Sequence, residues 1–161
     1  MTKDVTLDGL DPEGRALVEA ARAVSARAYS PYSALRVGAA LLLDDGRTVT
    51  GCNVENASYG LTMCAERVAL GASVALGLAG GQDSSRIVRV AVFCDRAEVL
   101  MPCGACRQVL AEFAEGTTEV LCASAEGPAR ITTVGELLPD AIGPRDVLGG
   151  GTGGASAGEQ D

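Results

Sequence analysis

An apolar strand, a helix and a second strand follow one another between residues 86 and 124, and this order restricts the fold more than any other feature of the sequence. RIVRVAVFC at 86–94 is β-branched and mostly apolar, which is typical of a strand covered on both faces. MPCG then turns into the helical pattern ACRQVLAEFAEG, and the next strand is TEVLCAS at 118–124. Alternation of strand and helix predicts an α/β sheet with helices on both faces.

The N-terminal part of the chain predicts a helix followed by a hairpin. Residues 12–28 place apolar side chains at helical spacing, with Asp11 as the N-cap. Pro31 cannot continue this helix, because a proline forces its predecessor out of the helical region. Residues 36–54 then predict two short strands around a turn at Asp45-Gly46.

A second helix and a final strand complete the predicted elements. From residue 61 to residue 78 the pattern is helical and apolar nearly all round, which indicates a buried helix. We expect this helix to begin near Cys64 and to be ended by Gly80-Gly81. Residues 131–139 predict a short strand that leads into one helical turn.

The length and the composition indicate one folded domain. With 161 residues, of which 47% are hydrophobic, the chain can bury a substantial core. We expect residues 1–148 to form a single catalytic domain. The Gly-rich tail at 149–161 has too little apolar content to pack and is expected to be disordered.

The absence of histidine excludes several kinds of catalytic machinery. The chain contains no histidine at all. Ser-His-Asp triads, Cys-His nucleophile systems and the HExxH zinc helix all need an imidazole. Any chemistry must therefore use carboxylates, thiolates, hydroxyls or a metal.

The charge and the apolar runs limit the possible partners. The 13 Lys and Arg residues against 21 Asp and Glu residues give a formal net charge of −8, which disfavours a polymeric nucleic acid as partner. No apolar run is long enough to span a membrane, and the N-terminus lacks the apolar core of a signal peptide. We therefore expect a soluble, cytoplasmic protein whose six cysteines are reduced.

Three of these cysteines form a pattern that is typical of metal binding. Cys103 and Cys106 lie three residues apart at a helix start, so both side chains can reach one metal ion, and the exposed N–H groups there stabilise thiolates. Cys64 completes a set of three ligands, which leaves the fourth position of a zinc ion open to water, as in catalytic sites. Glu66, two residues after a ligand, is placed to take a proton from that water.

Three thiolates on a divalent ion leave one net negative charge, so a nearby cation is expected. Arg67 and Arg107 are the adjacent candidates.

Two other interpretations of the cysteine pattern remain open from the residues alone. Cys-x-x-Cys between a strand and a helix is also the thioredoxin-like redox pattern. A purely structural zinc site would need a fourth ligand, but Cys52, Cys94 and Cys122 lie in apolar, strand-like segments and are expected to be core residues. A non-catalytic zinc or dithiol protein would be indifferent to the change Glu66→Gln.

The motifs between residues 29 and 138 resemble those of the small, all-cysteine, homotetrameric cytidine deaminases. YSPYS, VGAAL, GCNVEN, CAERVA, PCGACRQVL and GELLP stand in that family's order and spacing. The Cys-x-Glu and Pro-Cys-x-x-Cys motifs are the signature of zinc-dependent nucleobase deaminases. The resemblance implies a three-layer α/β/α sandwich around a five-stranded mixed sheet, and a homotetramer with shared active sites.

The same resemblance implies a hydrolase of pyrimidine salvage that holds one Zn²⁺ ion per chain. Cys64, Cys103 and Cys106 would bind the zinc, and Glu66 would carry protons. The implied reaction converts cytidine or 2′-deoxycytidine to uridine or 2′-deoxyuridine and releases ammonia.

The family's substrate contacts fall on several positions of this chain. The resemblance implies that Asn53 and Glu55 hold the ribose hydroxyls, that Ala65 contacts the substrate, and that Tyr59 reaches a neighbouring subunit's site.

Two positions depart from the family. Leu35 and Ile142 stand where the family usually has aromatic residues. Base stacking on an aromatic ring is worth roughly 1–3 kcal/mol, so cytidine is expected to bind about 5- to 150-fold more weakly. The alternative is the same zinc chemistry on a modified cytosine nucleoside or a nucleoside antibiotic.

Overall fold

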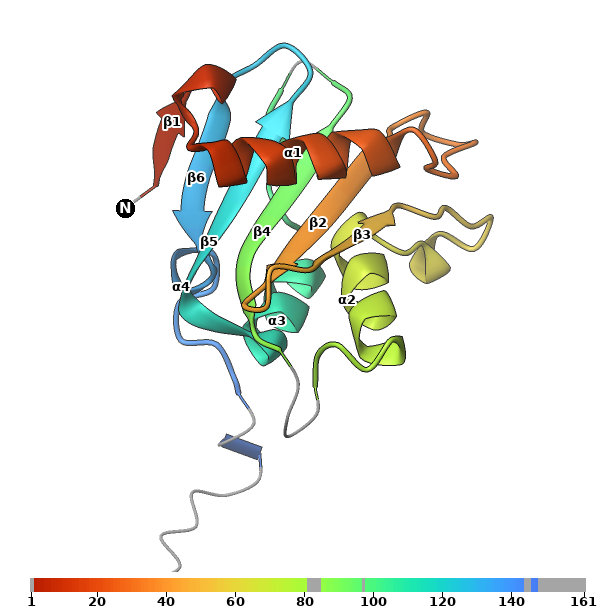
Figure 1. The fold of residues 1–161 in the computed structure, drawn as a ribbon. Coiled ribbons are helices and arrows are strands. Elements are labelled where there is room, and N and C mark those ends of the chain that lie inside the picture. Colours follow the sequence, from red (N-terminus) through yellow and green to blue (C-terminus); the bar gives the residue numbers. More distant parts are fainter. Residues whose placement is uncertain (1, 81–84, 97, 144–145, 148–161) are drawn as a thin grey trace, which may run out of the picture.

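The computed structural model describes residues 2–80, 85–96, 98–143 and 146–147 and is built on one mixed sheet of six strands (Figure 1). The strand order is β1-β6-β5-β4-β2-β3, and every neighbouring pair is antiparallel except β4 and β5. The strands are β1 Lys3–Val5, β2 Val37–Leu43, β3 Thr48–Cys52, β4 Ile87–Cys94, β5 Ala114–Ser124 and β6 Ala129–Thr133. The α-helices are α1 Pro12–Ser25, α2 Ala65–Ala75, α3 Gly104–Phe113 and α4 Val134–Leu137, with short 3-10 turns at Leu7–Gly9 and Tyr59–Leu61.

Helices cover both faces of the sheet, which confirms the predicted three-layer architecture. Along β2 the side chains alternate between two cores: Leu41 and Leu43 pack with α2 and α3, whereas Ala40 and Leu42 pack with α1. All seven residues of β2 are buried. Figure 1 shows α1 crossing the sheet while α2 and α3 lie on its other side.

The sheet has six strands among the described residues, not the expected five. The additional strand is β1, which pairs antiparallel with β6, with Lys3 opposite Ile131. Two of its three residues are charged, so no apolar alternation marks it in the sequence. Edge pairing and an ion pair between Arg130 Nε and Asp4 Oδ1, 2.7 Å apart, hold it in place.

The helix ends differ from the prediction in three places. α1 ends at Ser25, three residues before the end of the predicted span 12–28. Gly77, with a positive φ of 69°, terminates α2, and the Leu78 N–H donates to the Ser73 carbonyl at 2.8 Å. The expected stop at Gly80-Gly81 is therefore too late, and Gly81 lies outside the described residues. α3 ends at Phe113, and the next three residues, which the helical pattern included, begin β5.

The surface of α2 also differs from the expected all-round burial. Val74 and Leu76 are exposed in the single chain. The apolar pattern of this helix therefore has an outward face as well as a core face. The predicted Gly-rich tail falls outside the part of the chain that the structure describes.

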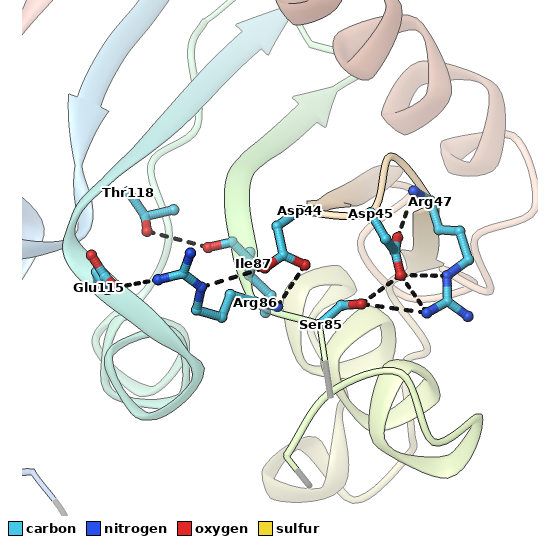
Figure 2. Close-up of polar contacts among 8 residues, drawn as sticks. All are labelled: Asp44, Asp45, Arg47, Ser85, Arg86, Ile87, Glu115 and Thr118. Carbon is cyan, nitrogen blue, oxygen red and sulfur yellow. Dashed lines mark hydrogen bonds and ion pairs between the residues drawn. The ribbon is translucent and has the colours of Figure 1, made fainter. Parts of the chain in front are cut away.

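A cluster of charged side chains joins the β2–β3 turn to the start of β4 (Figure 2). The Arg86 N–H donates to Asp44 at 3.1 Å, and the Arg86 guanidinium pairs with Glu115 at 3.2 Å. Hydrogen bonds from Arg47 hold the pKa of Asp45 well below its usual range. Exposed pairs of this kind contribute little to stability. A hollow of about 390 Å³ lies beside Arg86 and Glu115, and none of the predicted site residues lines it.

Two glycines let helices approach the sheet at backbone distance. A Cβ atom on Gly38 would lie 1.9 Å from the Ala21 carbonyl oxygen of α1. A Cβ atom on Gly51 would lie 2.4 Å from the Ala69 nitrogen of α2. Both contacts are with backbone atoms, so no side-chain rotation can relieve them.

We expect Gly38→Ala to destabilise the protein by about 3 kcal/mol or more, because α1 must move away from the sheet to admit the methyl group. Denaturant unfolding measures the loss. Gly60→Ala is the control: a Cβ atom there has no neighbour within 4 Å, so its effect should stay within about 0.5 kcal/mol. Equal stability of the two variants would contradict the close approach.

Candidate active site

Three cysteine side chains meet where α2 and α3 begin. Cys64 is the N-cap of α2 and Cys103 the N-cap of α3, and Cys106 lies in the first turn of α3. The Cys64 and Cys103 sulfurs are 3.8 Å apart and those of Cys103 and Cys106 are 3.5 Å apart, with all three sulfurs within 4.8 Å of one another. Sulfur ligands about 2.3 Å from a tetrahedral zinc ion lie about 3.8 Å from each other, so these cysteines fit a zinc ion.

The thiols of Cys64 and Cys106 differ in how readily they lose a proton. A hydrogen bond from Cys106, with help from Arg67 and Cys103, lowers the pKa of Cys64 to about 5. The pKa of Cys106 is raised, because its thiol donates to Cys64 and is buried. Cys64 is thus a thiolate at neutral pH, while Cys106 keeps the proton that a divalent cation would displace.

Arg67 is the cation that faces these sulfurs. Its Nη2 donates to the Thr62 carbonyl at 2.8 Å and lies 4.0 Å from the Cys64 sulfur. Arg107, the other candidate, donates to the Pro102 carbonyl at 2.8 Å and to the Leu137 carbonyl at 3.0 Å. Arg107 therefore ties the start of α3 to the end of α4, and Arg67 is the better placed for charge compensation.

Glu66 is a buried carboxylic acid beside the cysteines. Its exposed fraction is 4%. Burial is the main cause that raises its pKa, and the negative charge of Cys64 adds to it. A carboxyl group whose pKa is raised can both accept and return a proton, as a general acid and base must.

A hollow of about 300 Å³ brings Cys64 and Cys103 together with several other predicted site residues. Its lining includes Leu35, Asn53, Glu55 and Ala65 as well as Glu66. Part of this wall was not predicted from the sequence. The missed residues include Ser33, Thr62, Leu100 and Met101, which come from loops and carry no periodic signal.

Asn53 and Glu55 already have partners in the chain. Asn53 is buried, accepts a hydrogen bond from the Val37 N–H and donates one to the Leu35 carbonyl, both at 2.9 Å. Glu55 accepts from the Tyr32 N–H at 2.9 Å. Both residues therefore hold the loop that carries Leu35, and both also line the hollow.

Two of the predicted substrate-binding residues lie outside the lining of this hollow. Tyr59 is 76% exposed and packs edge-on against Tyr32, with ring centroids 6.0 Å apart. These two rings line an adjoining hollow of about 350 Å³ that shares Glu55. Ile142 is exposed, and its carbonyl accepts a hydrogen bond from Gln108 at 2.9 Å.

The remaining cysteines do not join the metal-ligand set. Cys94 and Cys122 are buried in the sheet, and Cys52 is half-buried. Burial raises the pKa of Cys122 to about 12, so this thiol stays protonated. The prediction that these strand cysteines pack in the protein interior holds for Cys94 and Cys122.

A three-thiol metal site with one buried carboxylic acid, on a sheet covered by helices on both faces, defines a zinc-dependent hydrolase of the deaminase class. A family model described as the cytidine and deoxycytidylate deaminase zinc-binding region matches residues 12–124. The chain belongs to this family. Zinc is accordingly its cofactor, and the three cysteines are the group that can hold the ion.

Individual relatives give the same result. The cytidine deaminase of Mycobacterium tuberculosis (strain H37Rv; ATCC 25618) is 50% identical over 123 residues, which are 76% of this chain and 84% of that protein. The cytidine deaminase of Halalkalibacterium halodurans is 46% identical over 127 residues, 78% of this chain and 92% of that protein. The crystal structure of cytidine deaminase from Burkholderia pseudomallei superposes with a TM-score of 0.73 and 48% identity, covering 79% of this chain and 97% of that one.

Among the described residues, none of the helices has the length and apolar character that crossing a membrane requires.

We expect the purified protein to contain about one zinc ion per chain and Cys103→Ser to lose most of it, because two thiolates and a neutral hydroxyl hold zinc far more weakly. Metal analysis after exhaustive dialysis is the measurement. Cys52→Ser is the matched control and should keep its zinc, since Cys52 lies outside the three-sulfur cluster. Full zinc in Cys103→Ser would show that the ligands are other residues.

Proposed function

We propose that this protein catalyses the hydrolytic deamination of cytidine and 2′-deoxycytidine, which yields uridine or 2′-deoxyuridine and ammonia. The observation that carries the proposal is the hollow in which Cys64, Cys103 and Glu66 adjoin Asn53 and Glu55. A cytosine ring entering this hollow would meet the metal ligands and Glu66 at one end. Its ribose would meet Asn53 and Glu55.

The chain's own residues would perform the proton transfers. Bound zinc, held by Cys64, Cys103 and Cys106, supplies an acidified water molecule as the nucleophile. Glu66 takes the proton of the attacking water and delivers it to ring nitrogen N3. Once the water oxygen has bonded to ring carbon C4, Glu66 moves the remaining proton of that oxygen to the amino group. The bond from C4 to the amino nitrogen then breaks, ammonia leaves, and the oxygen becomes the C4 carbonyl of the product.

Arg67 would offset the excess negative charge of the site. Three thiolates around a divalent ion carry one net negative charge, which would weaken the polarisation of the water. The Arg67 guanidinium beside the Cys64 sulfur opposes that charge. The buried position of Glu66 next to Cys64 makes this compensation more important, because two negative groups share one poorly solvated space.

The charge of the hollow favours a nucleoside over a nucleotide. Two of its lining residues, Glu55 and Glu66, are acidic, and the lining given by the described residues includes neither Lys nor Arg. A 5′-phosphate would therefore lack a cationic partner there. The relatives cited above carry the name cytidine deaminase, and they give no support to the alternative of a modified cytosine nucleoside.

The lost aromatic residues matter unequally in the single chain. Leu35 lines the hollow, so an aliphatic side chain replaces a stacking surface there. Ile142 is exposed and could contribute to a site only through another copy of the chain. The expected weaker binding of cytidine therefore rests on Leu35 for this chain's own site.

We expect the zinc-loaded protein to convert cytidine and 2′-deoxycytidine, and to act on their 5′-monophosphates about 100-fold or more less efficiently, because the acidic wall repels a phosphate. Ultraviolet absorbance during conversion to the uracil product gives kcat/KM for each substrate.

Glu66→Gln is the blank for this assay. It removes the proton carrier while keeping the shape of the side chain, so turnover should fall by about 10²- to 10⁴-fold or more with zinc retained. Glu112→Gln, on the exposed end of α3, should leave the rate unchanged. A zinc-loaded protein that does not convert cytidine, or a fully active Glu66→Gln variant, would contradict the proposed reaction.

We propose that copies of this chain assemble into a homotetramer that completes the active sites. Exposed apolar side chains support it: Tyr59 and Leu61 lie in the 3-10 turn that precedes Thr62 of the hollow, and Val74 and Leu76 lie at the end of α2. Large exposed apolar side chains are typical of protein interfaces.

Sedimentation at micromolar protein concentration is expected to give a tetramer, because association buries these side chains. We expect Leu76→Glu to shift the population toward smaller species. A wild-type protein that sediments as a monomer would contradict the assembly.

A further inference from the structure

The segment from Tyr29 to Val37 is held by the residues that follow β3. The Tyr29 N–H donates to the Asn53 carbonyl at 3.1 Å, and the Glu55 N–H donates to the Tyr29 carbonyl at 2.8 Å. The Asn53 side chain binds the backbone of this segment near its end. Figure 1 shows the two segments side by side beyond the end of α1.

Three donor groups of this segment form hydrogen bonds with the Glu55 carboxylate. Its Oε2 atom accepts from the Tyr32 N–H at 2.9 Å and from the Ser33 N–H at 3.3 Å. Its Oε1 atom accepts from the Ser33 hydroxyl. A carboxylate offers about four acceptor positions, so one position remains, and it is on Oε1.

The direction of the Ser33 hydroxyl proton follows from a second hydrogen bond. The Leu35 N–H donates to Ser33 Oγ at 3.0 Å, so the oxygen is already an acceptor there. A serine hydroxyl has one proton, and Glu55 is the partner that can take it. This hydrogen bond, with that from Tyr32, lowers the pKa of Glu55 and keeps it ionised.

Ser33 is itself held by two further features. Ala34, the next residue, has a positive φ of 54°, which is uncommon for a residue with a Cβ atom. Its N–H donates to the Ser30 carbonyl at 3.1 Å. From the other side, Arg96 donates to the Ser33 carbonyl at 3.1 Å. The serine thus occupies a fixed turn, so its hydroxyl stays in one direction.

We propose that Ser33 is a positioning residue that aims the free Oε1 position of Glu55 at a sugar hydroxyl of the substrate, and that it thereby sets the preference for nucleosides with ribose hydroxyls. This inference rests on the proposed deamination of cytidine. A glutamate side chain has several rotatable bonds, and ordering it only when substrate binds would weaken binding. The contacts from Ser33 and Tyr32 supply that order in advance.

Kinetics with two substrates test the role. The changes are Ser33→Ala, which removes the hydroxyl, and Ser33→Thr, which keeps it. With cytidine, we expect Ser33→Ala to lower kcat/KM by about 10-fold, nearly all of it through KM, because one hydrogen bond to a charged group is lost. 2′,3′-Dideoxycytidine lacks the 2′ and 3′ hydroxyls, which are the donors expected to face Glu55, and keeps only the 5′ hydroxyl. With this substrate the same change should alter kcat/KM by less than about twofold.

The controls separate positioning from folding. Ser33→Thr should restore the cytidine value, since a methyl group at this exposed position leaves the hydroxyl in place. Ser30→Ala removes a hydroxyl from the same turn that makes no hydrogen bond to Glu55 among the described contacts, and it should act like the wild type on both substrates. Zinc content and the unfolding midpoint are recorded for every variant.

Several outcomes would overturn the role of Ser33. These are an equal loss with both substrates, a loss in kcat at unchanged KM, no loss in Ser33→Ala, or failure of Ser33→Thr to restore activity. A wild-type protein that does not deaminate cytidine would instead overturn the proposed function, so the two failures are distinguishable.

Discussion

The backbone contact between α2 and β3 is the constraint on which the metal site depends. Gly51 has no side chain, so the Ala69 nitrogen and the Ala65 carbonyl oxygen of α2 approach within 2.4 Å and 2.7 Å of where a Cβ atom would stand. This approach fixes the start of α2, and with it Cys64. The parallel connection from β4 through α3 to β5 brings the start of α3 to the same end of the sheet. Any side chain on Gly51 would move one metal ligand away from the other two.

In this site, a negative charge on one acidic group makes ionisation of the neighbouring acidic groups less favourable. A chain without histidine has no imidazole ligand, and the three cysteines that can hold the ion bring negative charge to the metal as thiolates. Cys64 gains stability from Arg67 and from its place at a helix start, whereas Cys106 retains its proton. Glu66, buried beside them, is disfavoured as an anion. A divalent cation would favour the ionised forms of Cys106 and Glu66 together, so this arrangement suits metal binding.

Local patterns predicted most of this site, and tertiary contacts supplied the rest. The ligand spacing of Cys103 and Cys106 and the nearness of Glu66 to Cys64 are properties of single helices, so the sequence carries them. The strand β1 depends on pairing with a distant edge, and the change from helix to strand after Phe113 depends on the neighbouring β4, so neither has a local signal. Leu100 and Met101 reach the hollow from an irregular segment, which periodicity cannot identify. The roles given to the individual site residues remain predictions, and Tyr59 and Ile142 lie outside the lining of the hollow in the single chain.

Asn53 and Glu55, the residues proposed to hold the sugar, also form part of the wall of the site. The hydrogen bonds that they already make limit which groups of a ligand they can recognise. The Asn53 side-chain amide donates one of its two protons to the Leu35 carbonyl, so one proton remains for another acceptor. Glu55 has one free acceptor position on Oε1. One donor and one acceptor, both fixed by the backbone they hold, match a hydroxyl group, which can accept and donate at once. The Glu55 carboxylate would repel an anionic group of the ligand. An aliphatic group would leave both the Asn53 amide proton and the Glu55 Oε1 position without a hydrogen-bond partner. Recognition of a sugar hydroxyl therefore follows from the same hydrogen bonds that shape the loop, and Leu35 is held in the wall by them as well.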